Sequence, residues 1–209
     1  MKIKKVTTTR YVGEDGFEFT FEPIEDTLKI KETPEGFEAR YLVQDDDGYM
    51  DAEDLICEDD DLFLVNYHRD FEIKRDKIIT KDTVVDIYRG NDTEHVLDIK
   101  KQYWIFPMSM LSHSGVWLSL GSGFACDGGG WDTSHVGLLL VSKREWKTRE
   151  LALKAATAHI GEWNCVLSGD VYGCVAEFYD KSKKQLDRES CWGIIGLKYA
   201  LKELENFRG

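Results

Sequence analysis

Hydrophobic and polar positions alternate along the first forty residues. Apolar side chains recur at every second position in residues 17–21, 28–30 and 37–43, and residues 34–36 (Pro-Glu-Gly) separate the last two runs. A period of two places successive side chains on opposite faces of a strand, and Pro and Gly favour a turn. The pattern predicts an antiparallel N-terminal β-meander that buries one face.

Further strands are predicted by apolar runs in the rest of the chain. The run at residues 62–67 has the length and composition of a short buried strand, and a turn of residues 113–115 (His-Ser-Gly) separates two later runs. The predicted strands cover residues 62–67, 103–111, 116–120, 136–141 and 171–179. Five of the eighteen glycines fall in residues 121–130, which we expect to form a loop.

Helical spacing occurs in three places. Thr80 is a suitable N-cap for a short helix over residues 81–88 that Gly90 would close. Ser142 precedes Glu145 by three residues, which is capping-box spacing, and predicts a helix over about residues 143–163. Apolar residues at helical spacing predict a last helix over about residues 194–207.

Together these elements predict an α+β fold with a mostly antiparallel sheet, two main helices (about 143–163 and 194–207) and an N-terminal β-meander. We divide the chain into residues 1–60, the meander with an acidic segment, and residues 61–209, an α+β body. The two parts could also form one continuous domain, because no Pro/Ser-rich linker separates them.

Negative charge is concentrated in the first half. The 209 residues carry a net charge of −12. Residues 1–100 hold 27 acidic and 14 basic side chains, whereas residues 101–209 hold 12 and 13. Residues 45–61 contain ten acids and no Lys or Arg: Asp45, Asp46, Asp47, Asp51, Glu53, Asp54, Glu58, Asp59, Asp60 and Asp61.

The acidic segment allows three interpretations: a solvated loop, a cation site, or a surface that imitates the charge of phosphates. An EF-hand loop that starts at Asp45 would need an acid at position five and Gly at position six, where Tyr49 and Met50 stand, so calcium of that type is excluded. The acidic balance also excludes a basic nucleic-acid binder as the default.

Three features of the sequence indicate the environment of the protein. The first residues lack the apolar stretch of a signal peptide, and no apolar run approaches the roughly 20 residues of a membrane helix. Five cysteines, an odd number without paired spacing, favour a reducing compartment. We therefore expect a cytoplasmic protein that does not contact a membrane.

Five short motifs follow one another between residues 62 and 196. They are residues 64–69 (Leu-Val-Asn-Tyr-His-Arg), 113–115 (His-Ser-Gly), 131–137 (Trp-Asp-Thr-Ser-His-Val-Gly), 168–173 (Ser-Gly-Asp-Val-Tyr-Gly) and 190–193 (Ser-Cys-Trp-Gly). In this order and spacing they resemble a family of small acidic proteins carried by bacteriophages and plasmids. The resemblance implies a mobile-element accessory protein that acts inside a bacterial cell, and it assigns no catalytic residues. The N-terminal meander departs from the family pattern.

Cys191 is the candidate nucleophile. It precedes the last predicted helix, and a helix N-terminus favours the thiolate. The Ser-Cys-Trp segment also resembles the nucleophile segment of papain-like proteases, but no His follows Cys191 in this chain. A permuted order with His113 or His135 as the base stays open, and so does a small buried thiol beside a core Trp.

No cofactor or metal is predicted. Asp132 and His135 are the closest approach to a pair of zinc ligands, and His68, His113 and Asp170 could join them only if the strand ends converge. Neither Gly-rich run has the spacing of a dinucleotide or P-loop motif.

Two functional hypotheses remain beside the plain alternative of a virion or metabolic accessory protein without an enzymatic site. In the first, the protein binds and inhibits a host nucleic-acid-handling or defence system in the manner of an anti-CRISPR or anti-restriction protein. Its acids would meet a basic groove of a host protein, without direct contact to nucleic acid. In the second, it is a hydrolase or transferase in which Cys191 acts with His113 or His135. Convergence of these side chains in one pocket would favour the enzyme.

Overall fold

The computed structural model of the chain contains two compact units. It describes residues 3–5, 7, 9–24, 26–46, 55–68, 71–73, 79–121, 123–128 and 130–207. Unit 1 combines the two ends of the chain, residues 1–50 and 169–209, whereas unit 2 is the continuous segment 51–168. The fold class is α+β with antiparallel sheets.

This division differs from the expected parts 1–60 and 61–209. The chain crosses between the units near residue 50, within the acidic segment 45–61. It crosses again at residues 168–169. The sequence around the second crossing does not have the composition of a linker, so this boundary could not be predicted. It arises because strand β5 (Gly36–Gln44) pairs along its whole length with strand β11 (Val171–Asp180), so the C-terminal segment belongs with the N-terminal strands.

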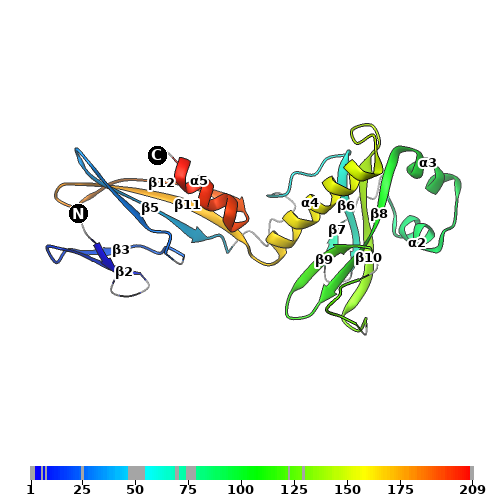
Figure 1. Cartoon of the computed structure of the whole chain (residues 1–209), viewed down its shortest axis with the longest axis horizontal. Helices are drawn as coiled ribbons and strands as arrows, with labels where there is room; N and C mark the ends of the chain where they lie inside the picture. Colours follow the sequence, from blue (N-terminus) through cyan, green and yellow to red (C-terminus); the bar gives the residue numbers. More distant parts are fainter. Residues whose placement is uncertain are drawn as a thin grey trace. The chain divides into compact units, whose positions relative to one another are not determined.

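Unit 1 contains two antiparallel sheets (Figure 1). The first has the order β1-β2-β3, and the second has the order β12-β11-β5-β4. The remaining strands of these sheets are β1 Ile3–Lys5, β2 Arg10–Gly13, β3 Glu18–Thr20, β4 Lys29–Thr33 and β12 Gln185–Ile195. The expected single meander over residues 17–43 is therefore corrected, because β3 belongs to one sheet while β4 and β5 belong to the other.

Strand β5 explains this correction, since it buries side chains on both of its faces. On one face an aromatic cluster joins the two sheets: Tyr11, Phe19, Phe21, Phe37, Tyr41 and Tyr179. On the other face Leu42 and Cys174 pack against Ala200 and Leu204 of helix α5 (Leu197–Asn206). A strand that is buried on both faces needs packing partners on both sides of its sheet. A three-strand meander with one buried face cannot supply them.

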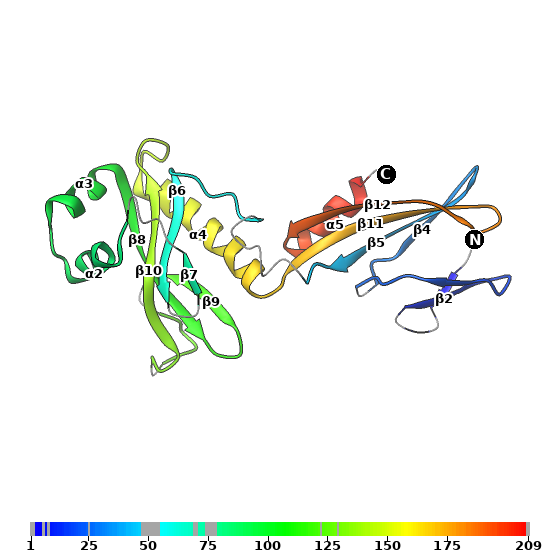
Figure 2. The ribbon, with the colours of Figure 1, turned by 180° about the vertical axis from the view of Figure 1, so that it is seen from behind.

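Unit 2 is built on a five-stranded antiparallel sheet in the order β7-β6-β10-β8-β9. The strands are β6 Leu62–His68, β7 Phe71–Ile73, β8 Tyr103–Ser112, β9 Val116–Leu120 and β10 Thr133–Ser142. Helix α4 (Arg149–Leu167) covers one face, and helices α2 (Lys81–Arg89) and α3 (Glu94–Gln102) lie on the opposite side (Figures 1 and 2). The central strand β10 is buried on both faces from Val136 onward.

The helix ends follow local sequence signals with one exception. Thr80 caps α2 and Gly90 closes it in a left-handed conformation, as predicted. The expected helix over 143–163 instead begins at Arg149, because Thr148 accepts the capping hydrogen bond. Ser142 ends strand β10, and its hydroxyl accepts a hydrogen bond from the amide of Arg144. Helix α3 is additional to the predicted elements.

Candidate functional site

The five sequence motifs fall into two groups. Residues 64–68, 113–115 and 131–137 belong to unit 2, whereas residues 169–173 and 190–193 belong to unit 1. Within unit 2 the first and third of these motifs are neighbours in the sheet, since Asn66 of β6 pairs with Gly137 of β10.

His113 and Asp132 meet at the end of the β8–β9 hairpin. The Nδ1 atom of His113 lies 3.0 Å from a carboxylate oxygen of Asp132. Both side chains are exposed, at 71% and 46%. The contact is a surface ion pair whenever His113 is protonated, and such pairs contribute little to stability. His113 therefore takes part in a surface contact, unlike His135, which lines a pocket.

The loop before Asp132 is held by Asp127. The Asp127 carboxylate accepts hydrogen bonds from the amides of Trp131 and Asp132 and from the hydroxyl of Thr133. The Thr133 hydrogen bond is the main reason why the pKa of Asp127 is lowered. The loop therefore presents Trp131, which is 91% exposed, with its amide bound to Asp127.

His135 has a defined hydrogen-bonding role. The Ser109 hydroxyl donates to the carbonyl of Gly121, so its oxygen accepts from Nδ1 of His135 at 3.2 Å. This arrangement puts a proton on Nδ1 and leaves Nε2 as the acceptor of the neutral ring. The ring also lies 5.5 Å from the ring of Tyr88.

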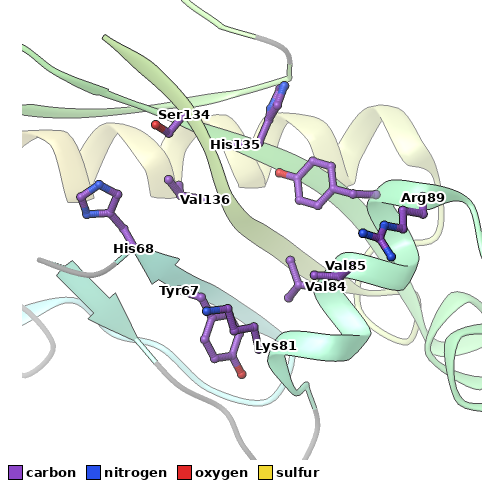
Figure 3. Close-up of a pocket in the computed structure, with 10 residues that line it drawn as sticks. Tyr67, His68, Lys81, Val84, Val85, Arg89, Ser134, His135 and Val136 are labelled. Atoms are coloured by element: carbon purple, nitrogen blue, oxygen red, sulfur yellow. The ribbon is translucent and has the colours of Figure 1, made fainter. Parts of the chain in front are cut away.

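His135 and His68 line one pocket, hereafter the α2 pocket (Figure 3). The pocket has a volume of about 530 Å³ and lies between α2 and the ends of β6 and β10. Its lining combines valines and tyrosines with basic side chains: Tyr67, His68, Lys81, Val84, Val85, Tyr88, Arg89, Ser134, His135 and Val136. A register shift in β10 between His135 and Gly137 accommodates Val136 here.

Cys191 lies on strand β12 in unit 1, opposite Cys174 of β11. It is exposed and is not at the start of α5, which begins six residues later. All five histidines of the chain are at positions 68–159 and thus in unit 2. Unit 1 therefore supplies no histidine that could activate Cys191. Burial raises the pKa of the neighbouring Cys174 thiol to about 11.

The motifs of unit 1 have structural roles around Cys191. The Trp192 ring covers Gly173, where a Cβ atom would lie 2.5 Å from the indole. The Asp170 carboxylate accepts a hydrogen bond from the Leu197 amide at the start of α5. The Gly193 amide donates to the Asp45 carboxylate at 3.0 Å. These contacts fix β12 and α5 against β11.

The acids of the predicted partner surface are used in several ways. Glu58 is nearly buried and Asp59 accepts hydrogen bonds from the amides of Asp61 and Leu62. Asp61 pairs with Arg144. Asp46 and Asp60 are exposed, whereas Asp45 is half-buried. Four further acids of the prediction lie outside the described residues: Asp47, Asp51, Glu53 and Asp54.

Sequence reasoning missed the cluster around Glu58. One carboxylate oxygen lies 2.8 Å from Nε2 of His159 and 3.0 Å from Nε1 of Trp163 on α4. The only available signal was the amphipathic pattern of α4, which places His159 and Trp163 four residues apart on one face. The basic residues of the α2 pocket were also missed, although the helix that carries them was predicted.

Neither a metal site nor a membrane helix is found in the described part of the chain. Within those residues no group of three or more His, Cys, Asp or Glu side chains is arranged to hold a metal ion. No helix there is long and apolar enough to cross a membrane.

Comparisons with protein-family models, with curated proteins and with solved structures find no match to this chain.

Proposed function

We propose that this chain is an accessory protein of the phage- or plasmid-borne type that binds and inhibits a basic host protein of a nucleic-acid-handling or defence system. The observation that carries the proposal is the acidity of both units. Unit 1 has 19 acidic and 14 basic side chains, a net charge of −5, and unit 2 has 20 and 13, a net charge of −7. A net negative charge attracts a basic partner and repels nucleic acid.

Inside each unit, the described reactive side chains do not pair Cys191 with a base, and this favours binding over catalysis. Cys191 is in the unit without histidine, His113 is paired with Asp132, and His135 is hydrogen-bonded to Ser109. Nucleophilic catalysis needs the base within hydrogen-bond reach of the nucleophile. The alternative hydrolase or transferase has no such pair inside either unit among the described residues.

We assign to the partner surface only those acids of residues 45–61 that do not also hold the fold. Asp45, Glu58, Asp59 and Asp61 hold the fold through the contacts given above. Neutralising these four acids would lower the stability of the fold as well as any binding. The two effects could then not be distinguished. Asp60 is also left out, because its backbone carbonyl accepts a hydrogen bond from the Tyr103 hydroxyl. The informative set is therefore Asp46 together with four acids outside the described residues: Asp47, Asp51, Glu53 and Asp54.

The test is protection of an infecting phage in bacteria that carry a restriction or CRISPR system. We expect the wild-type chain to raise the plating efficiency at least tenfold on one such host. Changing Asp46, Asp47, Asp51 and Asp54 to Asn and Glu53 to Gln should abolish this effect, because five charges that attract the target are removed.

The matched control removes five exposed acids elsewhere: Glu14, Glu22, Glu35, Asp187 and Glu203. It has the same net charge and should keep most of the protection. Binding to the purified target should weaken at least tenfold between about 50 and about 300 mM salt, because exposed charges are screened. Full protection by the first variant, or affinity independent of salt, would overturn the proposal.

A further inference from the structure

Among the residues that the structure describes, those that line the α2 pocket include no acidic side chain, although the protein has 39 Asp and Glu residues. Lys81 and Arg89 contribute fixed positive charge, and His68 and His135 contribute ring nitrogens. The described lining is thus basic, whereas the protein as a whole is acidic. Such an exception has a direct consequence for the kind of ligand that the pocket accepts.

The aromatic walls of the pocket are fixed in place. The Tyr67 hydroxyl donates to the carbonyl of Ile79 at 2.8 Å. The Tyr88 hydroxyl bonds to the carbonyls of Met108 and Gly137 and accepts from the Met108 amide at 3.2 Å. Both rings are anchored through the backbone, so a ligand would not have to order them. Pre-organised walls reduce the entropic cost of binding.

The cationic side chains are placed at the two ends of α2. Lys81 and Arg89 are eight residues apart, which corresponds to about 12 Å along the helix. Figure 3 shows Val84 and Val85 between them. Both cations are exposed, and neither forms an ion pair with the residues that the structure describes. Each is therefore available for an anionic group.

We infer that the α2 pocket binds a small organic anion, in which an apolar body lies against Val84, Val85 and Val136 and a carboxylate or phosphate group pairs with Lys81 or Arg89. The volume of about 530 Å³ falls within the range of small-molecule sites. The apolar wall selects the body, and charge selects the anion. This activity goes beyond the acidic surface and does not depend on it.

The experiment uses the full chain and three naphthalene probes: 2-naphthoate, 1-naphthyl phosphate and the neutral 2-naphthamide. Calorimetry gives the affinity, and methyl NMR of Val84, Val85 and Val136 reports the place of binding. We expect at least one anion to bind at least tenfold more tightly than the amide and to shift these methyl signals. The ratio between the two anions distinguishes a carboxylate ligand from a phosphate ligand.

Lys81→Gln combined with Arg89→Gln should weaken the anion at least tenfold and leave the amide unchanged. The matched control, Lys154→Gln combined with Lys181→Gln, removes two exposed cations outside the pocket and should bind as the wild type. Equal affinity for the anions and the amide, an unaffected Lys81/Arg89 variant, or unshifted valine methyls would overturn the inference. None of these results bears on phage protection.

Discussion

At the scale of single residues, Glu58 shows how an acid from a charged segment can serve the core. One oxygen of its carboxylate contacts the side chains of His159 and Trp163 and accepts a hydrogen bond from the amide of Leu64. The His159 and Trp163 side chains are almost completely buried. Leaving a buried donor without its acceptor costs folding free energy. These contacts therefore make Glu58 a structural residue.

We predict that Glu58→Ala lowers the free energy of unfolding by about 3 kcal/mol, because it leaves buried donors unpaired. Urea denaturation followed by circular dichroism measures the change. Asp46→Ala, an exposed acid from the same segment, is the control and should change the free energy by less than about 0.5 kcal/mol. Similar effects of the two variants would contradict the structural role of Glu58.

Asp127 provides a second residue-scale prediction, based on its lowered pKa. Because the folded-state pKa is below the ordinary value of 3.8, the stabilisation by Asp127 is present above that pH. It is lost as the pH falls through the folded-state pKa. Thr133→Val removes the largest cause of the shift and should raise the pKa of Asp127 toward 3.8.

Carbon-13 NMR titration of the Asp carboxyl groups measures this change. Asp180 is an internal control, since its pKa is lowered mainly by the hydroxyl of Ser182 and should not respond to the change at Thr133. An unaltered Asp127 titration in the Thr133→Val protein would show that another group determines its pKa.

At the scale of elements, strand β10 is the central feature of unit 2. It pairs with β6 on one side and with β8 on the other, and Leu138–Val141 are fully buried. Gly137 lies where β10 resumes regular pairing after the register shift. A Cβ atom at Gly137 would lie 1.9 Å from the carbonyl oxygen of Val65. Glycine is therefore required there by close approach of the neighbouring strand.

Gly137→Ala should lower the free energy of unfolding by more than about 2 kcal/mol, because backbone atoms must move to admit the methyl group. Gly161→Ala is the matched control in α4. Its Cβ atom would meet nothing within 4 Å, and alanine should stabilise the helix by about 0.5–1 kcal/mol. Thermal and urea unfolding of both variants measure the difference. A Gly137→Ala variant with an unchanged free energy of unfolding would contradict the register between β6 and β10.

At the scale of the whole molecule, the chain leaves unit 1 near residue 50 and returns to it at residue 169. Unit 2 is thus an uninterrupted segment with its own sheet and helices. Unit 1 depends on both ends of the chain, since β5 and β11 are adjacent strands of one sheet. The contrast between an acidic first half and a near-neutral second half consequently does not correspond to two bodies.

We predict that a fragment of residues 51–168 folds alone, because it retains every strand pair and helix contact of its sheet. Fragment 1–50 should remain unfolded, because β5 lacks β11. Amide proton dispersion in NMR and a cooperative thermal transition measure folding in each case. An unfolded 51–168 fragment, or a cooperatively folded 1–50 fragment, would contradict the division into units.

The candidate site was predictable only in part. The short helix that carries Lys81 and Arg89 follows from Thr80, Gly90 and its apolar spacing. The strand that ends in His68 follows from its apolar run. Their meeting beside His135 did not follow, because it depends on the order of strands in the sheet, and local patterns do not encode that order.

By itself, the sequence determined the α+β class, most of the strands, the limits of α2 and the overall acidity, because these depend on local periodicity, capping residues and composition. Only the tertiary structure decided which strands pair, which acids become structural and how the charge divides between units. Pairing between β5 and β11 joins residues more than a hundred positions apart. Such contacts are selected by the packing of the whole chain, and this packing turned Glu58 inward and assigned Cys191 to the unit that has no histidine.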